Sequence, residues 1–244
     1  MDAIIGASGL IGQHLCSIIN ADHFGSANIT ELADKKYDTI WVAAPSAVKW
    51  KANAEPEEDF RNIQILHSRI QTASARRIVH FSTVDVYAAA QLSGGPSESD
   101  GAEPDCAYGR NRLWLEKSWN ADTVQVVRLP GLFGTGLKKN IIFDLMNLRN
   151  YENISLSSTY QWYDLGDIPA LISDINLEKS MIINVSVEPT PTLVIVKEIF
   201  PDVLQECVGT SRVVYDMRSK DGYRFSKEKV IWQIKRYASQ HGSM

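Results

Sequence analysis

The sequence predicts an α/β fold: a doubly wound parallel sheet with a small C-terminal lobe. Short apolar strands alternate with helical patterns along the chain, a glycine-rich turn follows the first strand, and the pattern changes in the C-terminal part. Alternating strands and helices are typical of βαβ units, whose strands run parallel. We assign residues 1–135 and 160–187 to the sheet domain and residues 136–159 and 188–244 to the lobe.

Apolar runs and the turn residues between them locate the elements of the sheet domain. We expect helices at residues 10–20, 56–72 and 105–119, and strands at residues 2–5, 23–27, 38–42, 77–82 and 123–129. Asp105 is positioned to cap the third helix. Residues 88–105 are rich in Ser, Gly, Pro and Glu, which predicts a mobile loop.

The C-terminal part has shorter elements. After a loop at residues 130–136 we expect helices at 140–149, 168–175, 192–200 and from 226 onward, with Asp167 capping the second of them. Strands are predicted at residues 160–163 and 181–187. The first of these is aromatic, and its side chains Tyr160, Trp162 and Tyr163 either line a substrate pocket or, as we favour, form core or interface.

Three glycines, Gly6, Gly9 and Gly12, follow the first strand with the spacing G-x-x-G-x-x-G. The first lets the chain turn, the second lets the backbone approach a phosphate, and the third lets a helix pack closely on the strand. A turn that only tightens strand-to-helix packing is the alternative. The position between a strand and a helix favours a cradle for a dinucleotide pyrophosphate. The predicted helix has an apolar face formed by Leu10, Ile11, Leu15, Ile18 and Ile19.

Composition excludes several classes of function. The net charge of the 244 residues is −4, which argues against binding nucleic acid through a basic face. No apolar run is long enough for a membrane span, and the first residues read as a buried strand rather than a signal peptide. The three cysteines, Cys16, Cys106 and Cys207, suggest free thiols in a reducing cytoplasm, and Cys106 is read as an incidental small residue. The histidines show no metal-ligand spacing, so we expect no metal site.

Several segments, taken in order, resemble the extended short-chain dehydrogenase/reductase family, the group of nucleotide-sugar epimerases, dehydratases and reductases. They are GASGLIG (6–12), FSTVDVY (81–87), YGRNR (108–112), RLPGLFG (128–134), YDLGDIPALI (163–172) and IINVSVEPTPTLVIVKEIF (182–200). The resemblance implies a Rossmann-type fold whose C-terminal lobe binds substrate. It also implies proteins that often form homodimers through the helices flanking the sheet, here residues 56–72 and 105–119.

The family's chemistry uses a serine or threonine at a strand end and a tyrosine followed, four residues later, by a lysine. The resemblance therefore assigns the catalytic positions to Thr83, Tyr108 and Arg112, with arginine standing where lysine is expected. The alternative for Thr83 is a structural role, in which its hydroxyl only hydrogen-bonds backbone groups at the end of the strand. Asn62 sits where the family often has a supporting asparagine, although an exposed asparagine explains it nearly as well.

Arginine at position 112 changes the expected chemistry. A phenol has a pKa of about 10, so a tyrosine acting as a base near pH 7 needs a shift worth about 4 kcal/mol. A cation about 5 Å away supplies about 3 kcal/mol at an effective dielectric constant of about 20, whether it is lysine or arginine. Arginine, however, is planar and effectively never deprotonates. We expect Arg112 to hold a ribose and assist Tyr108 electrostatically but to relay protons poorly, giving reduced or altered activity.

Two further features bear on which reaction the protein catalyses and which nicotinamide cofactor it binds. Dehydratases of this family carry two acidic residues after the threonine; here the pair is Val84 and Asp85, which disfavours dehydration. For Asp85 a solvated turn residue is favoured over a general acid. Residues 25–28 hold neither an acidic residue for an adenosine ribose nor an arginine for a 2′-phosphate, and we lean slightly to NADP over NAD. The predicted cofactor contacts are Gly6, Ser8, Gly9, Leu10, Ile11, Gly12, Ala43, Ala44, Tyr108 and Arg112.

The resemblance thus implies an NAD(P)-dependent oxidoreductase or epimerase that acts on a nucleotide sugar or a related carbonyl or hydroxyl compound, with a 4-keto reductase fitting better than a dehydratase. The cysteines predict a cytoplasmic location. A non-catalytic dinucleotide-binding sensor or scaffold is the alternative, motivated by Arg112. A third, weaker reading is a partner-binding subunit that uses the fold only as architecture.

Overall fold

The computed structural model describes residues 1–177 and 181–241, and the chain divides into two compact units. Unit 1 comprises Met1–Ala88, Gly101–Arg128 and Ile168–Ile183; unit 2 comprises Ala89–Asp100, Leu129–Asp167 and Asn184–Met244. Residues 178–180 and 242–244, which fall in the predicted sheet domain and lobe, lie outside the described residues. The bounds of the units differ from the predicted domains, because residues 89–100, 129–135, 160–167 and 184–187 belong to unit 2.

A six-stranded sheet with the order β2-β1-β3-β4-β5-β9 forms the centre of unit 1. Its strands are β1 (Asp2–Ile5), β2 (Ala21–Phe24), β3 (Lys36–Val42), β4 (Ser74–Thr83), β5 (Val124–Leu129) and β9 (Ile182–Asn184). β1 pairs in parallel with both β2 and β3, and β3 pairs in parallel with β4. The chain therefore winds first to one side of β1 and then to the other, which confirms the predicted doubly wound α/β fold.

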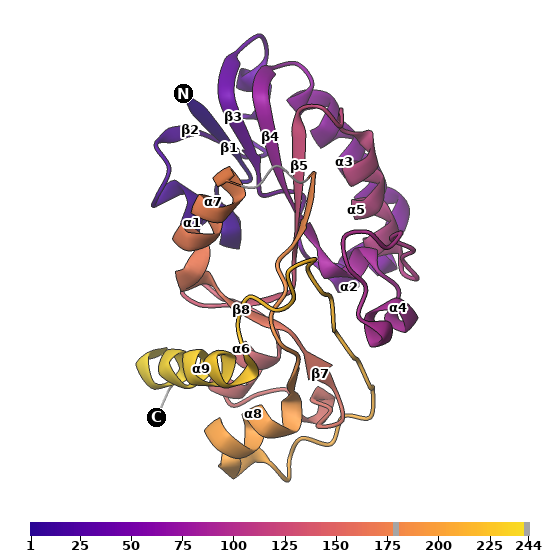
Figure 1. The fold of residues 1–244 in the computed structure, drawn as a ribbon, viewed down its shortest axis with the longest axis vertical. Coiled ribbons are helices and arrows are strands. Elements are labelled where there is room, and N and C mark those ends of the chain that lie inside the picture. Colours follow the sequence, from indigo (N-terminus) through magenta and orange to yellow (C-terminus); the bar gives the residue numbers. More distant parts are fainter. Residues whose placement is uncertain (178–180, 242–244) are drawn as a thin grey trace. The chain divides into compact units, whose positions relative to one another are not determined.

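Helices cover both faces of this sheet. Figure 1 shows α1 (Leu10–Cys16) and α7 (Ile168–Leu177) on one face, and α3 (Pro56–Ile70) and α5 (Ala107–Ser118) on the other. Burial on both faces explains why β5, with the sequence VQVVRL, is buried at all six positions. Ile63 and Ile70 of α3 and Leu115 of α5 join the same apolar core as the strand residues Ile40 and Val42.

A short helix that the sequence analysis does not predict, α2 (Lys49–Ala54), precedes α3. Pro56 begins α3 and has no N–H to continue the hydrogen-bond pattern of α2. The residue before a proline is driven out of the helical region, and Glu55 has φ −127° and ψ 61°. The proline thus separates the two helices and turns α2 toward the start of α5, which α2 contacts.

Several predicted boundaries are wrong for identifiable reasons. The helix after the glycines ends at Cys16, because a hydrogen bond from Ile18 N to Leu15 O tightens the next turn, and Ile18 is exposed. Cys106, not Asp105, caps α5: its sulfur accepts a hydrogen bond from Gly109 N at 3.5 Å. The stretch predicted as a mobile loop contains a helix, α4 (Ala89–Gly94).

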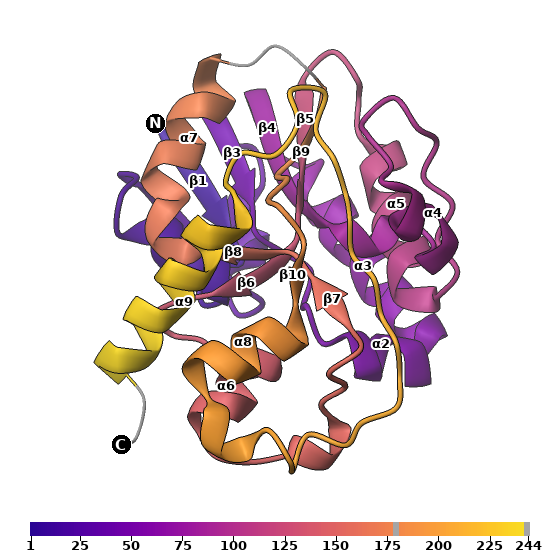
Figure 2. The ribbon, with the colours of Figure 1, turned by 60° about the horizontal axis from the view of Figure 1, so that its bottom comes forward.

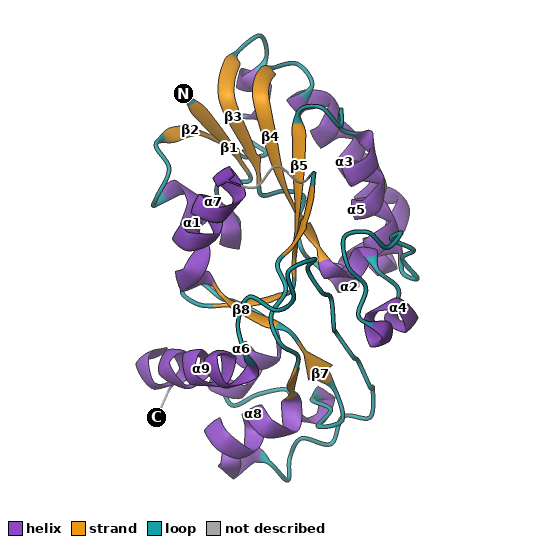
Figure 3. Ribbon diagram, viewed as in Figure 1, coloured by secondary structure: helices purple, strands orange, loops and turns teal. Residues whose placement is uncertain are grey.

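Apart from the long helix at its C-terminal end, unit 2 is built from short elements joined by long loops, as Figure 3 shows. β6 (Gly131–Phe133) pairs in parallel with β8 (Trp162–Asp164), and β7 (Thr159–Tyr160) pairs antiparallel with β10 (Thr190–Pro191), which lies beside it in Figure 2. Its remaining α-helices are α6 (Ile141–Met146), α8 (Thr192–Ile199) and α9 (Lys227–His241). Single 3-10 turns occur in both units at Ile29–Leu32, Val84–Val86, Tyr151–Asn153, Leu165–Asp167 and Pro201–Val203.

One buried amide joins three segments of unit 2. Gln161, between β7 and β8, donates hydrogen bonds to the carbonyls of Val187 and Met217 and accepts one from Met217 N. Beside it, Trp162 and Tyr163 are buried, so two of the three predicted aromatic residues belong to the core of this unit. Among residues 1–177 and 181–241, no helix combines the length and apolarity needed to cross a membrane.

Candidate functional site

The carboxyl ends of β1 and β3 lie side by side at the point where the strand order reverses. In open α/β sheets ligands bind outside such strand ends. Gly6 follows β1 and Ala43 follows β3, and Ala43 N donates a hydrogen bond of 2.8 Å to Ile5 O. The two predicted cofactor segments, the glycine turn and Ala43–Ala44, therefore border the same crevice of unit 1.

The glycine turn cannot accept larger residues at its first and third glycines. Gly6 has φ +84°, and a Cβ there would lie 2.6 Å from Ala43 O. A Cβ on Gly12 would lie 2.0 Å from Gly6 O, because α1 packs directly on the turn. Between them, Ser8 and Gly9 are exposed. The turn thus presents bare backbone at the surface of the crevice, which is the shape that a dinucleotide pyrophosphate requires.

The start of α1 adds hydrogen-bond donors to this turn. Gln13 N bonds Gly9 O, the first bond of the helix. The preceding amides, those of Leu10, Ile11 and Gly12, have no acceptor within the helix, as is general for a first turn. Four of the predicted cofactor contacts, at residues 8 and 10–12, are therefore main-chain groups of one turn.

The loop after β2 closes on itself. The Asn28 side chain accepts a hydrogen bond from Gly25 N at 2.8 Å and donates one to His23 O at 3.0 Å. The Asn28 side chain therefore shapes the loop. Ser26 is the other polar side chain of residues 25–28 and takes no part in these two bonds. This arrangement does not distinguish NAD from NADP.

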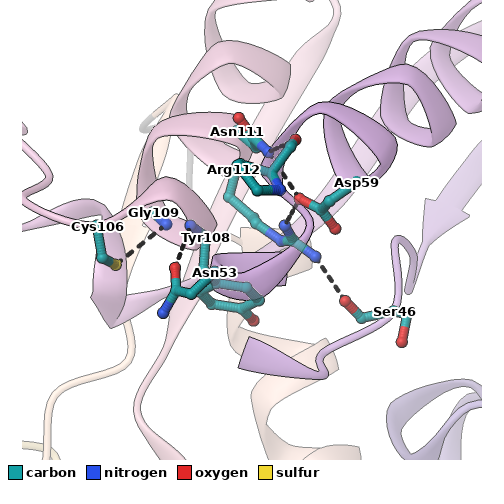
Figure 4. Close-up of polar contacts among 9 residues, drawn as sticks. Ser46, Asn53, Asp59, Cys106, Tyr108, Gly109, Asn111 and Arg112 are labelled. Atoms are coloured by element: carbon teal, nitrogen blue, oxygen red, sulfur yellow. Dashed lines mark hydrogen bonds and ion pairs between the residues drawn. The ribbon is translucent and has the colours of Figure 1, made fainter. Parts of the chain in front are cut away.

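Thr83 and Tyr108, predicted from the resemblance, do meet. Thr83 is the last residue of β4, and its side chain lies near enough to the Tyr108 phenol to lower the pKa of that phenol. Tyr108 lies in the first turn of α5, is 6% exposed, and is held by its main chain, since its N–H donates to Asn53 Oδ1 at 2.9 Å (Figure 4). The asparagine that supports this tyrosine is therefore Asn53 of α2, whereas Asn62 is exposed on α3.

Arg112 lies one helical turn after Tyr108 and stacks on its ring, with Cζ 4.0 Å from the ring centroid. Its side chain is 3% exposed. One guanidinium nitrogen donates to Asp59 of α3, and another donates to Ser46 O at 2.6 Å (Figure 4). Asn111 also donates to Asp59, at 2.8 Å. The guanidinium therefore ties α5 to α3 and to the loop after β3.

Asp85 is paired with a lysine that the sequence analysis does not single out. Lys49 Nζ lies 2.8 Å from Asp85 Oδ1, and the Asp85 side chain is 14% exposed. The expectation of a solvated turn aspartate is therefore wrong. Asp85 Oδ2 also accepts a hydrogen bond from Thr83 Oγ1 at 3.3 Å. Partial burial lowers the pKa of Lys49, but its pairing with Asp85 outweighs this and raises the pKa overall.

The phenol of Tyr108 is protonated in this environment. Burial is the largest influence and raises its pKa above the ordinary value, and the Asp85 charge adds to this. Arg112, the Thr83 side chain and Lys49 act in the opposite direction without reversing the shift. A neutral phenol beside a strand-end hydroxyl is suited to donate a proton to a substrate oxygen.

A buried ion pair holds α5, the helix that carries Tyr108 and Arg112, to the sheet. Glu116 of α5 and Arg128 of β5 are both nearly inaccessible, and Arg128 Nη2 lies 2.6 Å from Glu116 Oε2. Arg128 also donates to the Tyr87 hydroxyl at 2.7 Å, and Ser82 donates to Glu116. This network fixes α5 against the ends of β4 and β5, one helical turn after Arg112.

Sequence reasoning missed four residues of this site: Ser46, Lys49, Asn53 and Asp59. All four lie between β3 and the middle of α3, a segment in which no pattern predicted a helix before Pro56. Pro56 marks the start of α3, as is common for a proline at the first helical position, but it gives no signal for the polar residues that precede it.

Comparison with known proteins supports the fold. No protein-family model and no curated protein sequence matches the chain. TunA, a NAD-dependent NDP-hexosamine 5,6-dehydratase involved in tunicamycin biosynthesis, aligns over 98% of both chains with a TM-score of 0.70 and 14% identity. A UDP-glucuronic acid 4-epimerase from Bacillus cereus, in complex with NAD and UDP-4-deoxy-4-fluoro-glucuronic acid, covers 98% of this chain and 99% of its own, with a TM-score of 0.69 and 14% identity.

A third similar structure is dTDP-4-dehydrorhamnose reductase from Bacillus anthracis, in complex with NADP. It aligns over 98% of both chains, with a TM-score of 0.67 and 15% identity. At such identities the likeness establishes the fold rather than the reaction. The chain therefore has the Rossmann-type fold found in extended short-chain dehydrogenase/reductase enzymes of nucleotide sugars, as the sequence resemblance predicts.

Proposed function

We propose that this protein is an NAD(P)-dependent oxidoreductase or epimerase acting on a nucleotide sugar or a related carbonyl compound, and that carbonyl reduction is its favoured reaction. The observation that carries the proposal is that the Tyr108 phenol lies beside the Thr83 side chain at the carboxyl end of the sheet. The glycine turn lies at the same end of this sheet. The nucleotide-sugar enzymes that share the fold support the substrate class.

Each predicted residue has a defined task in this proposal. Tyr108 holds the proton that passes to the substrate oxygen, and its raised pKa keeps that proton in place at neutral pH. Thr83 orients the same oxygen through its hydroxyl. Arg112, buried between the phenol ring and Asp59, maintains the position of the ring. The ribose contact predicted for Arg112 would have to be made by guanidinium donors that Asp59 and Ser46 leave over.

The residues of the crevice fit a nicotinamide dinucleotide. The glycine turn leaves the space that side chains would fill, and the small side chains Ala43 and Ala44 border it. Such a cofactor, when bound, exchanges a hydride with a substrate carbon. Residues 25–28 hold neither a carboxylate for the adenosine ribose nor an arginine for a 2′-phosphate, and we propose NADP as the slightly preferred cofactor. Calorimetric titration with NADPH and NADH tests this preference, and tighter binding of NADH would contradict it.

Turnover tests the reaction. The protein is mixed with NADPH and a panel of keto-sugar nucleotides, and the absorbance of the reduced nicotinamide is followed. We expect oxidation with at least one compound, and a Tyr108→Phe variant should lose about 100-fold or more of that rate. If the protein binds the cofactor but turns over no member of the panel, this result would count against the proposal that it is an enzyme.

The alternative is a non-catalytic NAD(P)-binding sensor or scaffold. The confinement of the Arg112 guanidinium by Asp59 and Ser46 favours it, because this cation has limited freedom to take part in chemistry. A sensor binds cofactor and is stabilised by it against heat, yet shows no turnover. A partner-binding subunit that uses the fold only as architecture shows no such stabilisation.

We also propose a homodimer that pairs through α3 and α5, and a cytoplasmic location. Size-exclusion chromatography with light scattering tests the first, since a monomer at micromolar concentration would contradict it. Cell fractionation followed by immunoblotting tests the second.

A further inference from the structure

We propose that Lys49 of α2 is the cationic partner of the Tyr108 phenol, in place of the ammonium that position 112 lacks. The inference rests on the proposed function, because it assigns a further positioning residue to the same site. It differs from the sequence prediction, in which Arg112 alone supplies the positive charge.

The geometry of α2 brings Lys49 to the site. Lys49 and Asn53 are four residues apart on one helix, so their side chains leave the same face. Asn53 accepts the main-chain hydrogen bond of Tyr108, and Lys49 binds Asp85 at 2.8 Å. The Asp85 carbonyl in turn packs on the residue after Tyr108, since a Cβ on Gly109 would lie 2.0 Å from it. One face of α2 therefore holds both the backbone and the electrostatic surroundings of the phenol.

The two cations near Tyr108 occupy different places. The Arg112 guanidinium lies over the face of the Tyr108 ring and is nearly inaccessible. Its N–H groups donate to the Asp59 carboxylate and to Ser46 O. The Lys49 ammonium pairs with Asp85, which also accepts a hydrogen bond from the Thr83 hydroxyl. The Lys49 side chain is 45% exposed. An ammonium is compact and has three donors that rotate freely, whereas a guanidinium is planar and its donors point in fixed directions.

Charges around the phenol support this assignment. The charges of Arg112 and, more weakly, of Lys49 lower the pKa of Tyr108, and the charge of Asp85 raises it. In the other direction, Asp85, Cys106 and Tyr108 all raise the pKa of Lys49. Lys49 thus favours, through its own charge, the phenolate that is left after the proton has passed to a substrate oxygen, and it also offsets the opposing charge of Asp85.

The first test reads the phenol directly and needs neither cofactor nor turnover. Tyr108 is replaced by 3,5-difluorotyrosine, whose phenol titrates at lower pH, and the ¹⁹F NMR signal is followed against pH in the cofactor-free protein. We expect Lys49→Met to raise the midpoint and Lys49→Arg to keep it near that of the parent. Lys51→Met is the matched control, because Lys51 lies on the same helix but pairs with Glu55 and Glu58, and it should leave the midpoint unchanged.

A second background separates a direct effect of Lys49 from simple neutralisation of Asp85. Lys49→Met is compared with the parent in an Asp85→Asn protein, where no carboxylate remains to be neutralised. The proposal predicts that the midpoint still rises. An unchanged midpoint in this background would overturn it, as would an unchanged midpoint for Lys49→Met alone.

Kinetics complete the design. With a keto-sugar nucleotide that the wild-type protein reduces, Lys49→Met should lower kcat by about tenfold or more with little change in KM, and Lys49→Arg should recover much of the loss. Absence of turnover in the wild-type protein counts against the proposed function but leaves the ¹⁹F result to decide on Lys49. Wild-type turnover with an unaffected Lys49→Met variant overturns the role of Lys49 alone.

Discussion

The glycine turn and the pocket around Tyr108 lie in the same unit but are specified in different ways. The turn is a local structure: a few consecutive residues, with Gly6 and Gly12 in contact, determine its shape. The pocket is assembled from the end of β4 and from α2, α3 and α5. Tyr108 lies against Asn53 and Thr83 and under Arg112, whose guanidinium is held by Asp59. A local motif can be identified from sequence spacing, whereas an assembled pocket can be identified only through its partners.

Removing Asp59 should produce the largest change and break the pocket while sparing the turn. Asp59→Ala leaves the buried Arg112 guanidinium without its carboxylate, a situation that costs about 3–5 kcal/mol. Urea unfolding followed by fluorescence measures this loss. Glu58→Ala is the control, because that side chain is exposed and lies 3.8 Å from Lys51, and it should cost less than about 0.5 kcal/mol. Equal effects of the two substitutions would mean that Arg112 does not depend on Asp59.

Gly12→Ala is the corresponding test of the turn. The new Cβ would lie 2.0 Å from Gly6 O and 2.8 Å from Ala7 Cα, so the backbone must move. We expect a loss of about 1–3 kcal/mol in the free energy of unfolding and a weaker affinity for NADPH in calorimetry. Gly101→Ala, where a Cβ meets nothing within 4 Å, should change neither quantity measurably. A Gly12→Ala protein with wild-type stability and affinity would show that close packing of α1 is not required.

Arg112→Lys sharpens the comparison, because it restores the residue expected from the sequence resemblance without restoring its surroundings. One ammonium cannot reproduce the bonds to both Asp59 and Ser46 together with stacking on the Tyr108 ring. We expect a loss of about 1.5–3 kcal/mol in stability and no gain in reductase activity. Arg110→Lys, on an exposed position of the same helix, serves as the control. A large gain in activity would instead indicate an enzyme held back by its arginine.

The outcome of sequence reasoning follows the same division. The strand β1 and the glycine turn were predictable, because each depends on residues close together in sequence, and the doubly wound sheet was predictable from the alternation of strands and helices. Thr83 and Tyr108 were found through the family resemblance. Lys49 and Asn53 were not, because α2 lacks an apolar periodicity: of its six residues only Ala52 is buried. Its role comes from polar contacts with α5 and Asp85, and such contacts leave no periodic signal.

The last test concerns a histidine on the pocket side, and its expected effect is the smallest. His80 of β4 is completely buried, and its Nδ1 accepts a hydrogen bond from Trp119 Nε1 at 3.1 Å. Burial lowers its pKa from 6.5 to about 3. An unfolded chain therefore takes up a proton on this residue below pH 6.5 that the folded protein refuses, and stability falls as the pH decreases, by about 1.4 kcal/mol per unit at most. Between about pH 6.5 and 5.5 the loss should be about 1 kcal/mol.

His80→Asn removes this titration while keeping an acceptor for Trp119, so urea unfolding of the variant should depend less on pH over that interval. His23→Asn, at an exposed position of β2 beside the glycine turn, should keep the wild-type dependence. Because both variants retain every carboxylate, the difference between their slopes isolates the buried imidazole. If the His80→Asn protein loses stability in acid as steeply as the wild type, the burial of His80 does not contribute to the pH dependence of stability.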